Sequence, residues 1–356
     1  MKALILAGGT GSRLRPLTYT SAKQLVPVAN KPVLFYGLEA VVEAGITEVG
    51  VVVGETREEI QAAVGDGSAF GCRVTYIEQK APLGLAHAVL IAEEFLSPDP
   101  FVMYLGDNLI AGGIVSLVEE FREQGPNAEI LLARVPNPEQ FGVAALDEDG
   151  RVCSLEEKPS QPKSDLALVG VYMFDASVFE SVRRIEPSER GELEITDAIQ
   201  DLVDRGLEVL PHQVRGWWKD TGKPEDILEA NRIVLETLAV SRHGVLGDDS
   251  RIEGRVEIGE DVEISRSLIR GPAIIGNGVR LEEAFIGPST SIGDGCRITR
   301  AEIENSIVMS GSRLEDLPRR IDASLIGRDV WVGRSEGKPR AFRFVLGDGS
   351  QLRIPE

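Results

Sequence analysis

Apolar and polar positions follow two different patterns along this chain, and the first occupies residues 1–235. There, short apolar runs rich in β-branched residues alternate with stretches whose apolar side chains recur at helical spacing. This alternation predicts a mostly parallel sheet flanked by helices. The expected strands are residues 2–6, 49–53, 74–78, 101–106, 128–135 and 166–174, with a hairpin within 141–159. The expected helices are residues 33–44, 57–64, 84–95 and 113–124, with further helices beginning near 197 and after 224.

The second pattern is a repeat in the last third of the chain. Apolar residues followed by Gly or Ser recur every 17 residues, at Ile258, Ile275, Ile292, Met309 and Ile326. Further apolar residues follow six positions after several of these, at Ile264, Leu281, Ile298 and Val332. A coil of about three hexapeptides is typical of a parallel β-helix, in which stacked coils share an apolar column. We therefore expect an α/β domain over residues 1–236, a linker over 237–244 and a β-helix domain over 245–356.

A glycine-rich loop follows the first expected strand, with glycines at positions 8, 9 and 11. Such a loop lets the backbone approach a ligand closely and leaves amide N–H groups free to face an anion. Arg13 and Lys23 add two cations, as a triphosphate would require. Neither common phosphate motif, GxxxxGK[ST] or GxGxxG, is present, and a Gly-Gly turn alone is weak support because tight turns also use glycine.

Two carboxylates are candidate metal ligands, and each has a simpler interpretation. Asp107 follows an apolar strand, where it could cap a helix or hold Mg²⁺ through its oxygens. Asp220 precedes Thr221-Gly222 and could be only a turn residue. Similarly, Glu157 and Lys158 taken alone would be a solvated charge pair, which contributes little to stability.

Composition and charge exclude some classes of partner and indicate a location. The formal net charge of −19 disfavours a nucleic-acid partner, because a protein that follows a phosphate backbone needs a basic face. Three cysteines, Cys72, Cys153 and Cys296, are widely separated and predict free thiols. Neither a signal peptide nor a membrane span is expected, and a cytoplasmic location is the simplest prediction.

Seven motifs in order carry a family resemblance: LILAGGTGSRLRPLT, AKQLVP, LGDN, FGV, EEKP, GELEITD and DTG. This series resembles the sugar-1-phosphate nucleotidylyltransferases, and most closely the glucose-1-phosphate thymidylyltransferases, over residues 1–235. The resemblance implies a Rossmann-like α/β domain that joins a nucleoside triphosphate to a sugar 1-phosphate and releases pyrophosphate. It also implies dTTP and glucose 1-phosphate as substrates and Mg²⁺ as cofactor.

The resemblance also implies roles for individual residues. The nucleotide would be bound by Leu6, Gly8, Gly9, Thr10, Gly11, Arg13, Lys23, Gln24, Gln79, Gly84 and Asp107. The sugar and its phosphate would be bound by Gly142, Glu157, Lys158, Leu168, Tyr172 and Arg190. Asp107 and Asp220 would hold the metal, and the catalytic groups would be Arg13, Lys23, Asp107 and Lys158.

Three positions depart from the pattern common in the family. Phe141 stands where many members have Tyr, near the expected sugar phosphate. Leu83 and His87 replace the commoner Asp and Gln beside the expected base pocket. The choice between dTTP and UTP, and the identity of the sugar, therefore stay open. A non-catalytic regulator is the alternative of another class, although such chains usually lack a cation or a metal-binding acid that is present here.

The repeat resembles the left-handed β-helix that long-form members carry. Some relatives use this domain for acetyl transfer through a histidine, but His87, His212 and His243 all precede the repeats. Assembly is the expected role, and the resemblance implies a homo-oligomer, a trimer or tetramer. The tail, Phe342–Leu346 followed by Gly347-Asp348-Gly349, is expected to cap the coils or pack on a neighbouring copy.

Overall fold

The computed structural model describes residues 1–247 and 249–334, so the predicted role of the tail lies outside the described residues. The chain forms two compact units. The first unit comprises Met1–Thr10, Ser21–Leu25 and Val33–Asp220. The second comprises Gly11–Thr20, Val26–Pro32 and the chain from Thr221 onward. Two short N-terminal segments thus group with the C-terminal part, which the domain bounds predicted from sequence do not anticipate.

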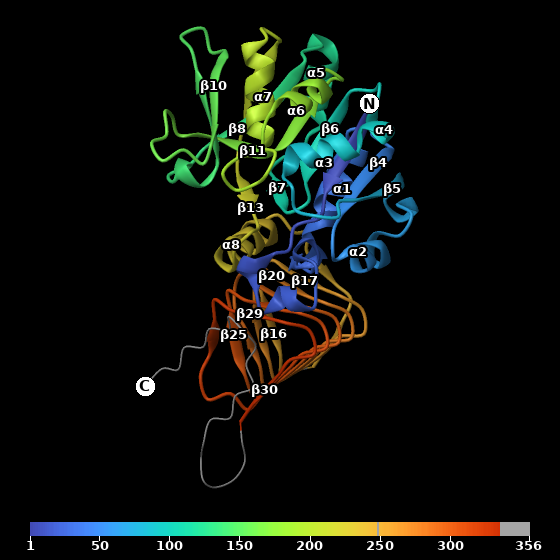
Figure 1. The fold of residues 1–356 in the computed structure, drawn as a ribbon. Coiled ribbons are helices and arrows are strands. Elements are labelled where there is room, and N and C mark those ends of the chain that lie inside the picture. The colour runs from blue at the N-terminus through green and yellow to red at the C-terminus, as the bar shows by residue number, and fades with distance from the viewer. Residues whose placement is uncertain (248, 335–356) are drawn as a thin grey trace. The chain divides into compact units, whose positions relative to one another are not determined.

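The first unit is built on a mixed nine-stranded sheet (Figure 1). Its path is β10-β9-β11-β6-β1-β4-β5, with β8 pairing both β11 and β12. Strands β6, β1, β4 and β5 are parallel, whereas β11 is antiparallel to β6, β8 and β9. The strands are β1 (Lys2–Leu6), β4 (Glu48–Val53), β5 (Arg73–Glu78), β6 (Phe101–Leu105), β8 (Ala128–Arg134), β9 (Gly142–Leu146), β10 (Val152–Glu157), β11 (Leu166–Phe174) and β12 (Val209–Gln213). A separate two-stranded ladder pairs β7 (Asn108–Ile110) with β13 (Trp218–Asp220).

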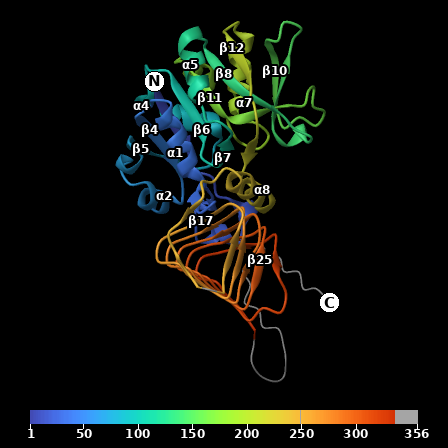
Figure 2. The ribbon, with the colours of Figure 1, turned by 180° about the vertical axis from the view of Figure 1, so that it is seen from behind.

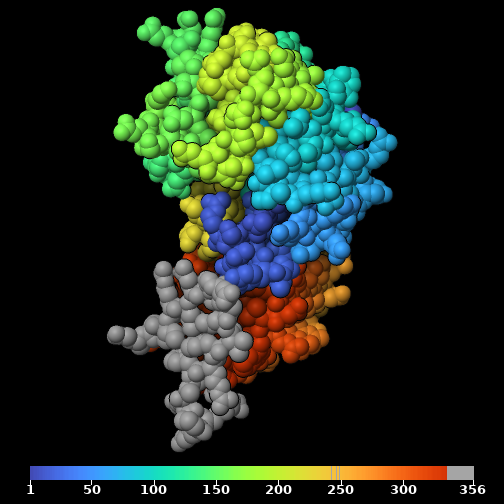
Figure 3. Space-filling view, viewed as in Figure 1, coloured from blue at the N-terminus to red at the C-terminus, as the bar shows by residue number. Residues whose placement is uncertain are grey.

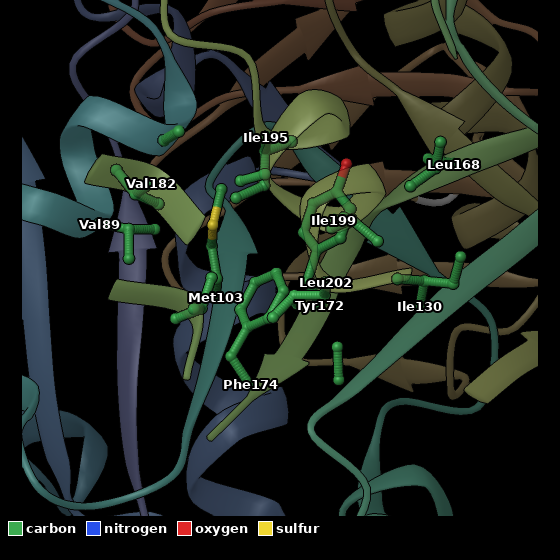
Figure 4. Packing of buried hydrophobic residues seen from close by; sticks show 14 of the residues in the cluster. Val89, Met103, Ile130, Leu168, Tyr172, Phe174, Val182, Ile195, Ile199 and Leu202 are labelled. Carbon is green, nitrogen blue, oxygen red and sulfur yellow. The ribbon is translucent and has the colours of Figure 1, made fainter. Parts of the chain in front are cut away.

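Helices cover both faces of this sheet, as the alternating pattern predicts. One face packs against α1 (Val33–Glu43), α2 (Arg57–Val64) and α5 (Val115–Gln124). The other packs against α3 (Leu85–Ile91), α4 (Glu93–Leu96), α6 (Val178–Arg184) and α7 (Ile195–Asp204). In Figure 3, the yellow-green atoms of α6 and α7 adjoin the cyan atoms of α3 and α4 on one face of the unit. Figure 4 shows the core on this side, where Tyr172 and Phe174 of β11 lie among Met103, Ile130, Ile195 and Ile199.

The helix predicted over residues 84–95 is two helices, with a break at Ala92. The Ala92 amide bonds the carbonyl of Val89, three residues back, at 3.2 Å. This hydrogen bond spans three residues, whereas α-helical bonds span four, so it ends the first helix. A new helical turn starts at Glu93. The other predicted elements agree with the observed bounds to within about two residues.

The second unit contains a parallel β-helix of three sheets (Figure 2). The first sheet contains β14 (Ser241–Arg242), β17 (Val256–Ile258), β20 (Ala273–Ile275), β23 (Thr290–Ile292), β26 (Ile307–Val308) and β29 (Leu325–Ile326). The second contains β15 (Val245–Leu246), β18 (Glu263–Ser265), β21 (Arg280–Glu282), β24 (Arg297–Thr299), β27 (Arg313–Glu315) and β30 (Trp331–Gly333). The third contains β16 (Arg251–Glu253), β19 (Leu268–Arg270), β22 (Phe285–Ile286), β25 (Glu302–Glu304) and β28 (Ile321–Asp322). The predicted β-helix is therefore present, with an apolar column inside.

The predicted register of the repeat is wrong at one coil. Ile258, Ile275 and Ile292 pair in series, but Ile292 then pairs with Val308 and not with Met309. Val308 in turn pairs with Ile326. The corner that precedes Val308 is one residue shorter than the corner that precedes Ile292, and the next coil is longer by one residue. A constant spacing of 17 residues therefore predicts the wrong member of the column at this step only.

A buried asparagine joins three elements of the second unit. Asn231 lies on α8 (Pro224–Leu235), and its Oδ1 accepts hydrogen bonds from the Ala29 amide at 2.8 Å and the Ser291 hydroxyl at 2.7 Å. Its Nδ2 donates to the Ser289 carbonyl at 3.1 Å. Ala29 lies in the turn between the short strands β2 (Pro27–Val28) and β3 (Lys31–Pro32). These bonds explain why an N-terminal hairpin groups with the coils.

Two further predictions concern the whole chain. All three cysteines are free thiols, as predicted, with Cys72 and Cys296 buried and Cys153 exposed. Within residues 1–247 and 249–334, no helix has the length and apolar character needed to cross a membrane.

Candidate active site

The parallel strands β1, β4, β5 and β6 end at one edge of the sheet, where ligands bind in folds of this kind. At this edge the amide of Gly106 donates to the Leu6 carbonyl at 3.0 Å. A Cβ placed on Gly8 would lie 3.4 Å from the Gly54 nitrogen and 3.7 Å from Oε1 of Gln79. The fold therefore brings the glycine-rich loop next to the residues that follow β4 and β5.

Gly9 adjoins the side chains of Lys23 and Gln24. A Cβ on Gly9 would lie 2.7 Å from Cε of Lys23, so only glycine fits here without displacing that cation. Gln24 is 1% exposed, and its Oε1 has no hydrogen-bond partner among the residues that the structure describes. A buried acceptor without a donor is costly, and a ligand N–H group would satisfy it.

Lys23 forms an ion pair with Asp107, and both side chains are largely buried. Burial alone would raise the pKa of Asp107, but the Lys23 ammonium, through its charge and its hydrogen bond, holds that pKa below its usual value. Asn108 adds a hydrogen bond from Nδ2 to Asp107 Oδ1 at 3.1 Å. Asp107 is therefore a carboxylate in the folded protein, with a cation beside it.

Asp220 is the last residue of β13, and Asp107 directly precedes β7, the strand that pairs with β13. In this pairing Asp220 lies opposite Asn108, the residue after Asp107. Asn108 Oδ1 accepts hydrogen bonds from the Trp218 indole at 2.5 Å and from the Gly170 amide at 3.3 Å, which fixes this corner. Because β7 and not a helix follows Asp107, the helix-cap interpretation is wrong. Carboxylate oxygens are ligands that a hard divalent cation such as Mg²⁺ prefers, so these two acids are candidates to hold one.

The loop after β5 packs against the segment before α7. Gly84 has φ +102°, and a Cβ there would lie 2.3 Å from the Leu193 carbonyl oxygen. Gln79 Nε2 donates to the Gly84 carbonyl at 3.1 Å and lies 3.1 Å from Nδ1 of His87. Burial lowers the pKa of His87, so its imidazole is neutral near pH 7 and Nδ1 can accept from Gln79. His87 therefore helps to orient Gln79.

A second group of predicted residues gathers around Glu157. A Cβ on Gly142 would lie 2.9 Å from Leu168, 3.1 Å from Glu157 and 3.2 Å from Thr196. The Thr196 hydroxyl donates to Glu157 Oε2 at 2.7 Å. Burial raises the pKa of Tyr172, and the Glu157 charge adds to this effect. Tyr172 is therefore neutral, and this group offers a carboxylate with apolar and hydroxyl neighbours.

Two cations adjoin Glu157. Its Oε1 lies 3.3 Å from the Arg190 guanidinium and 3.4 Å from the Lys158 ammonium. Arg190 also bonds the buried Glu194 at 2.8 Å. Burial alone would lower the pKa of Arg190, but the hydrogen bond and charge of Glu194 raise it. Glu157-Lys158 is thus part of an ordered network and not an isolated solvated pair.

Gly11 and Arg13 belong to the segment Gly11–Thr20, which groups with the second unit. Gly11 has φ +64° and precedes the short 3₁₀ helix Ser12–Leu14, in which Arg13 is exposed. The Thr18 hydroxyl donates to the Gly11 carbonyl at 2.7 Å. Gly11 and Arg13 are therefore not among the predicted site residues that the first unit brings together.

The sequence alone does not indicate the roles of several residues in this region. Asn108, Glu194 and Thr196 hold the predicted residues in place, and His87 contacts Gln79. Asn108, Glu194 and Thr196 lie inside LGDN and GELEITD, so these motifs contained the signal. In the sequence, His87 stands out only as a departure from the common pattern.

The chain is similar to several known proteins over most of its length. The sequence profile of the nucleotidyl transferase family matches residues 2–237. Over 355 residues the chain is 58% identical to glucose-1-phosphate thymidylyltransferase from Streptomyces antibioticus, covering 99% of both proteins. Over 358 residues it is 50% identical to the low-salt glycan biosynthesis nucleotidyltransferase Agl11 of Haloferax volcanii, covering 99% of this chain and 100% of that protein. A solved Bacillus anthracis structure in complex with sucrose, described as a glucose-1-phosphate thymidylyltransferase, is 36% identical with a TM-score of 0.63, covering 68% of this chain and 98% of that one.

Proposed function

Since this chain belongs to the nucleotidyl transferase family, we propose that it transfers a thymidylyl group from dTTP to α-D-glucose 1-phosphate. The products are dTDP-glucose and pyrophosphate. The observation that carries this proposal is the similarity over 99% of the chain to a glucose-1-phosphate thymidylyltransferase at 58% identity. The residues gathered at the carboxyl edge of the sheet agree with it, because they offer a cation, two acids and a close backbone approach.

The nucleotide is proposed to bind at the glycine-rich loop. Leu6, Gly8, Gly9, Thr10 and Gly11 would face the triphosphate through their backbone, with Lys23 and Arg13 on its phosphates. Gln24, Gln79 and Gly84 would bind the base. The buried Oε1 of Gln24, which has no hydrogen-bond partner among the described residues, supports this role, because a pyrimidine offers one imino N–H.

Asp107 and Asp220 are proposed to hold Mg²⁺. Asp220 pairs with Asn108, the residue after Asp107, and oxygen ligands are those that Mg²⁺ prefers. When bound, the ion would offset negative charge on the phosphates. Lys23 forms an ion pair with Asp107 in the folded chain. When Mg²⁺ and the triphosphate bind together, Asp107 would bind the ion and Lys23 would bind the phosphates.

Glucose 1-phosphate is proposed to bind at the Glu157 group. Glu157, Gly142, Leu168 and Tyr172 would contact the sugar ring. Lys158 and Arg190 would bind its phosphate, since both are exposed cations within 3.4 Å of Glu157.

The reaction needs no protein nucleophile. A phosphate oxygen of glucose 1-phosphate attacks the α-phosphorus of dTTP, and the bond from that phosphorus to the pyrophosphate oxygen breaks. The sugar phosphate is already ionised at neutral pH, so the main obstacle is to bring two anions together in line. Lys158 and Arg190 would hold the nucleophile, and Lys23 and Arg13 would stabilise the leaving pyrophosphate. Positioning and charge stabilisation would supply most of the rate enhancement.

The β-helix is proposed to serve assembly into a homo-oligomer, a trimer or tetramer. Support comes from its parallel strand ladders, because the end strands of a sheet need a partner or a cover. A cytoplasmic location fits the three free cysteines, since disulfides are rare in reducing compartments. Light scattering after size exclusion measures the oligomeric state.

A substrate panel tests the proposed function. Pyrophosphate release is measured with dTTP or UTP, each paired with glucose 1-phosphate and with other sugar 1-phosphates. We expect dTTP with glucose 1-phosphate to give the highest kcat/KM. A preference for UTP or for another sugar phosphate would replace the substrate assignment, and no release with any pair would indicate a non-catalytic binding protein.

A further inference from the structure

Three potential metal ligands meet away from the candidate active site: Glu120 on α5, Glu129 on β8 and His212 on β12. One ligand atom from each lies within 4.8 Å of the other two. In the parallel β8–β12 register Glu129 lies opposite Leu210, and His212 lies opposite Leu131. Side chains alternate along a strand, so Glu129 and His212 point to the same face of the sheet. Figure 2 shows α5 beside these two strands, and α5 packs on the same core as Leu131.

Glu129 is buried, and its carboxyl group has no hydrogen-bond partner within the described part of the chain. Glu129 is 1% exposed, and neither of its carboxylate oxygens has a hydrogen bond among the described residues. Leaving a buried carboxyl group unsatisfied is costly, and proteins usually pair such a group or use it to coordinate a metal. Its two neighbours offer a second carboxylate and an imidazole. A ligand that binds all three groups would remove the free-energy cost of leaving Glu129 unsatisfied.

The other two ligands are already in contact and reach solvent. His212 Nδ1 lies 3.0 Å from Glu120 Oε2, and their side chains are 29% and 38% exposed. In a tetrahedral zinc site with bonds of about 2.1 Å, neighbouring ligand atoms lie about 3.4 Å apart. The His212–Glu120 pair is somewhat closer than that spacing and the whole cluster lies within 4.8 Å, so small side-chain movements would bring all three atoms onto one ion. The two partly exposed side chains leave a route for an ion from solvent.

We propose that Glu120, Glu129 and His212 bind a divalent transition-metal ion such as Zn²⁺, which ties α5 to the β8–β12 edge of the sheet. An imidazole with two carboxylates favours Zn²⁺ over Mg²⁺ or Ca²⁺, which prefer oxygen ligands alone. Three protein ligands plus water complete the common coordination number of four.

This site is separate from the proposed catalytic metal. Met173 of β11 pairs with Glu129 on one side and with Val102 on the other. Glu129 is thus level with the beginning of β6, whereas Asp107 follows the end of that strand. The two sites lie at opposite ends of β6, and an ion can be assigned to one of them by mutation.

The test measures Zn²⁺ bound to the full-length chain. The protein is treated with EDTA, dialysed against Zn²⁺ with excess Mg²⁺, and its metal content is determined by mass spectrometry. We expect one Zn²⁺ per chain in the wild type and in Asp107→Asn. Glu129→Gln and His212→Gln should each weaken Zn²⁺ binding by roughly 100-fold, since loss of a direct ligand should exceed the tenfold or greater loss caused by outer-shell changes.

The matched control is Glu123→Gln, which changes an exposed carboxylate of the same helix. It should bind Zn²⁺ as the wild type does. His212→Gln changes a partly exposed side chain, so it serves if Glu129→Gln does not fold. Absence of Zn²⁺ binding in the wild type would overturn the proposal. So would equal affinity in His212→Gln and Glu123→Gln, or a bound Zn²⁺ that is lost only in Asp107→Asn.

Replacing Zn²⁺ by Co²⁺ gives a second readout that does not depend on activity. The wild type should show the intense visible absorption of four-coordinate Co²⁺, and His212→Gln should lose it. A spectrum of six-coordinate Co²⁺ in both proteins would contradict the proposed ligand set.

Discussion

The two units of this chain obtain their structure from contacts of very different sequence separation. In the β-helix, each residue pairs with one that lies a single coil away, as Ile258 does with Ile275. In the candidate active site, the Lys23–Asp107 pair spans 84 residues, and the bond between Trp218 and Asn108 spans 110. A local repeat can therefore specify the β-helix coil by coil, whereas the site exists only once the whole sheet has formed.

The comparison can be tested first by breaking the site alone. Asp107→Asn should lower kcat by about 10³-fold, roughly 4 kcal/mol, because the proposed metal loses a charged ligand. Steady-state rates of pyrophosphate release at varied Mg²⁺ concentration measure the effect. Asp149→Asn changes an exposed acid in the turn between β9 and β10 and should leave kcat unchanged. An unchanged response to Mg²⁺ in Asp107→Asn would remove that residue from the metal site.

A second variant asks whether a residue that groups with the second unit serves the site. Arg13→Ala should lower kcat by about 10²-fold, close to the loss seen when one pre-organised donor to a transition-state charge is removed. Arg15→Ala is the matched control, because Arg15 is also an exposed arginine of this segment. Its guanidinium lies 4.9 Å from the Tyr19 ring, and no role in the reaction is proposed for it. If both variants turn over at the wild-type rate, Arg13 has no part in the reaction.

The third variant breaks the repeat. Ile303 is fully buried in the column of the β-helix, and Ile303→Ala should cost about 3 kcal/mol through lost burial and the cavity left behind. Calorimetry measures the loss, and kcat at low temperature should stay near the wild-type value. The neighbouring exposed Glu302→Ala removes only a surface ion pair with Arg320 and should cost less than about 1 kcal/mol. Equal losses in the two variants would contradict the assigned column.

A fourth test within the first unit is the pH dependence of its free energy of unfolding when no metal is bound. Burial, together with the charge of Glu120, raises the pKa of Glu129 from 4.5 to about 8. The folded state therefore keeps a proton that the unfolded chain releases near pH 4.5. The bound proton adds to the free energy of unfolding, and this addition is complete below about pH 4.5. As the pH rises, the free energy of unfolding falls by about 1.4 kcal/mol per pH unit up to about pH 8.

Denaturant titrations in EDTA between about pH 5.5 and 7.5 measure this slope. Glu129→Gln should flatten it, because the amide does not titrate. Parallel slopes in wild type and variant would show that Glu129 does not carry the extra proton.

Much of this structure could be predicted from the sequence, for reasons that specific residues illustrate. The apolar runs gave the strands of the sheet, and the 17-residue spacing gave the β-helix. The spacing failed at Met309, because one corner shortens and the next coil lengthens, so Val308 occupies the column. A fixed period contains no information about such a compensating change.

The site shows the same limit more strongly. The residues of each motif were recognisable, but no local pattern indicates that Thr196 donates to Glu157 or that His87 contacts Gln79. The cluster of Glu120, Glu129 and His212 has no motif spacing at all, since three separate elements bring it together. Contacts of this kind follow from topology, which the sequence specifies only as a whole.

The most direct test of the central claim is the position of the metal in a crystal of the chain with dTTP and Mn²⁺, located by anomalous scattering. The account predicts one ion within about 2.1 Å of a carboxylate oxygen from both Asp107 and Asp220, with the Lys23 ammonium on the triphosphate. An ion that contacts only one of these acids, or neither, while dTTP is bound would contradict it.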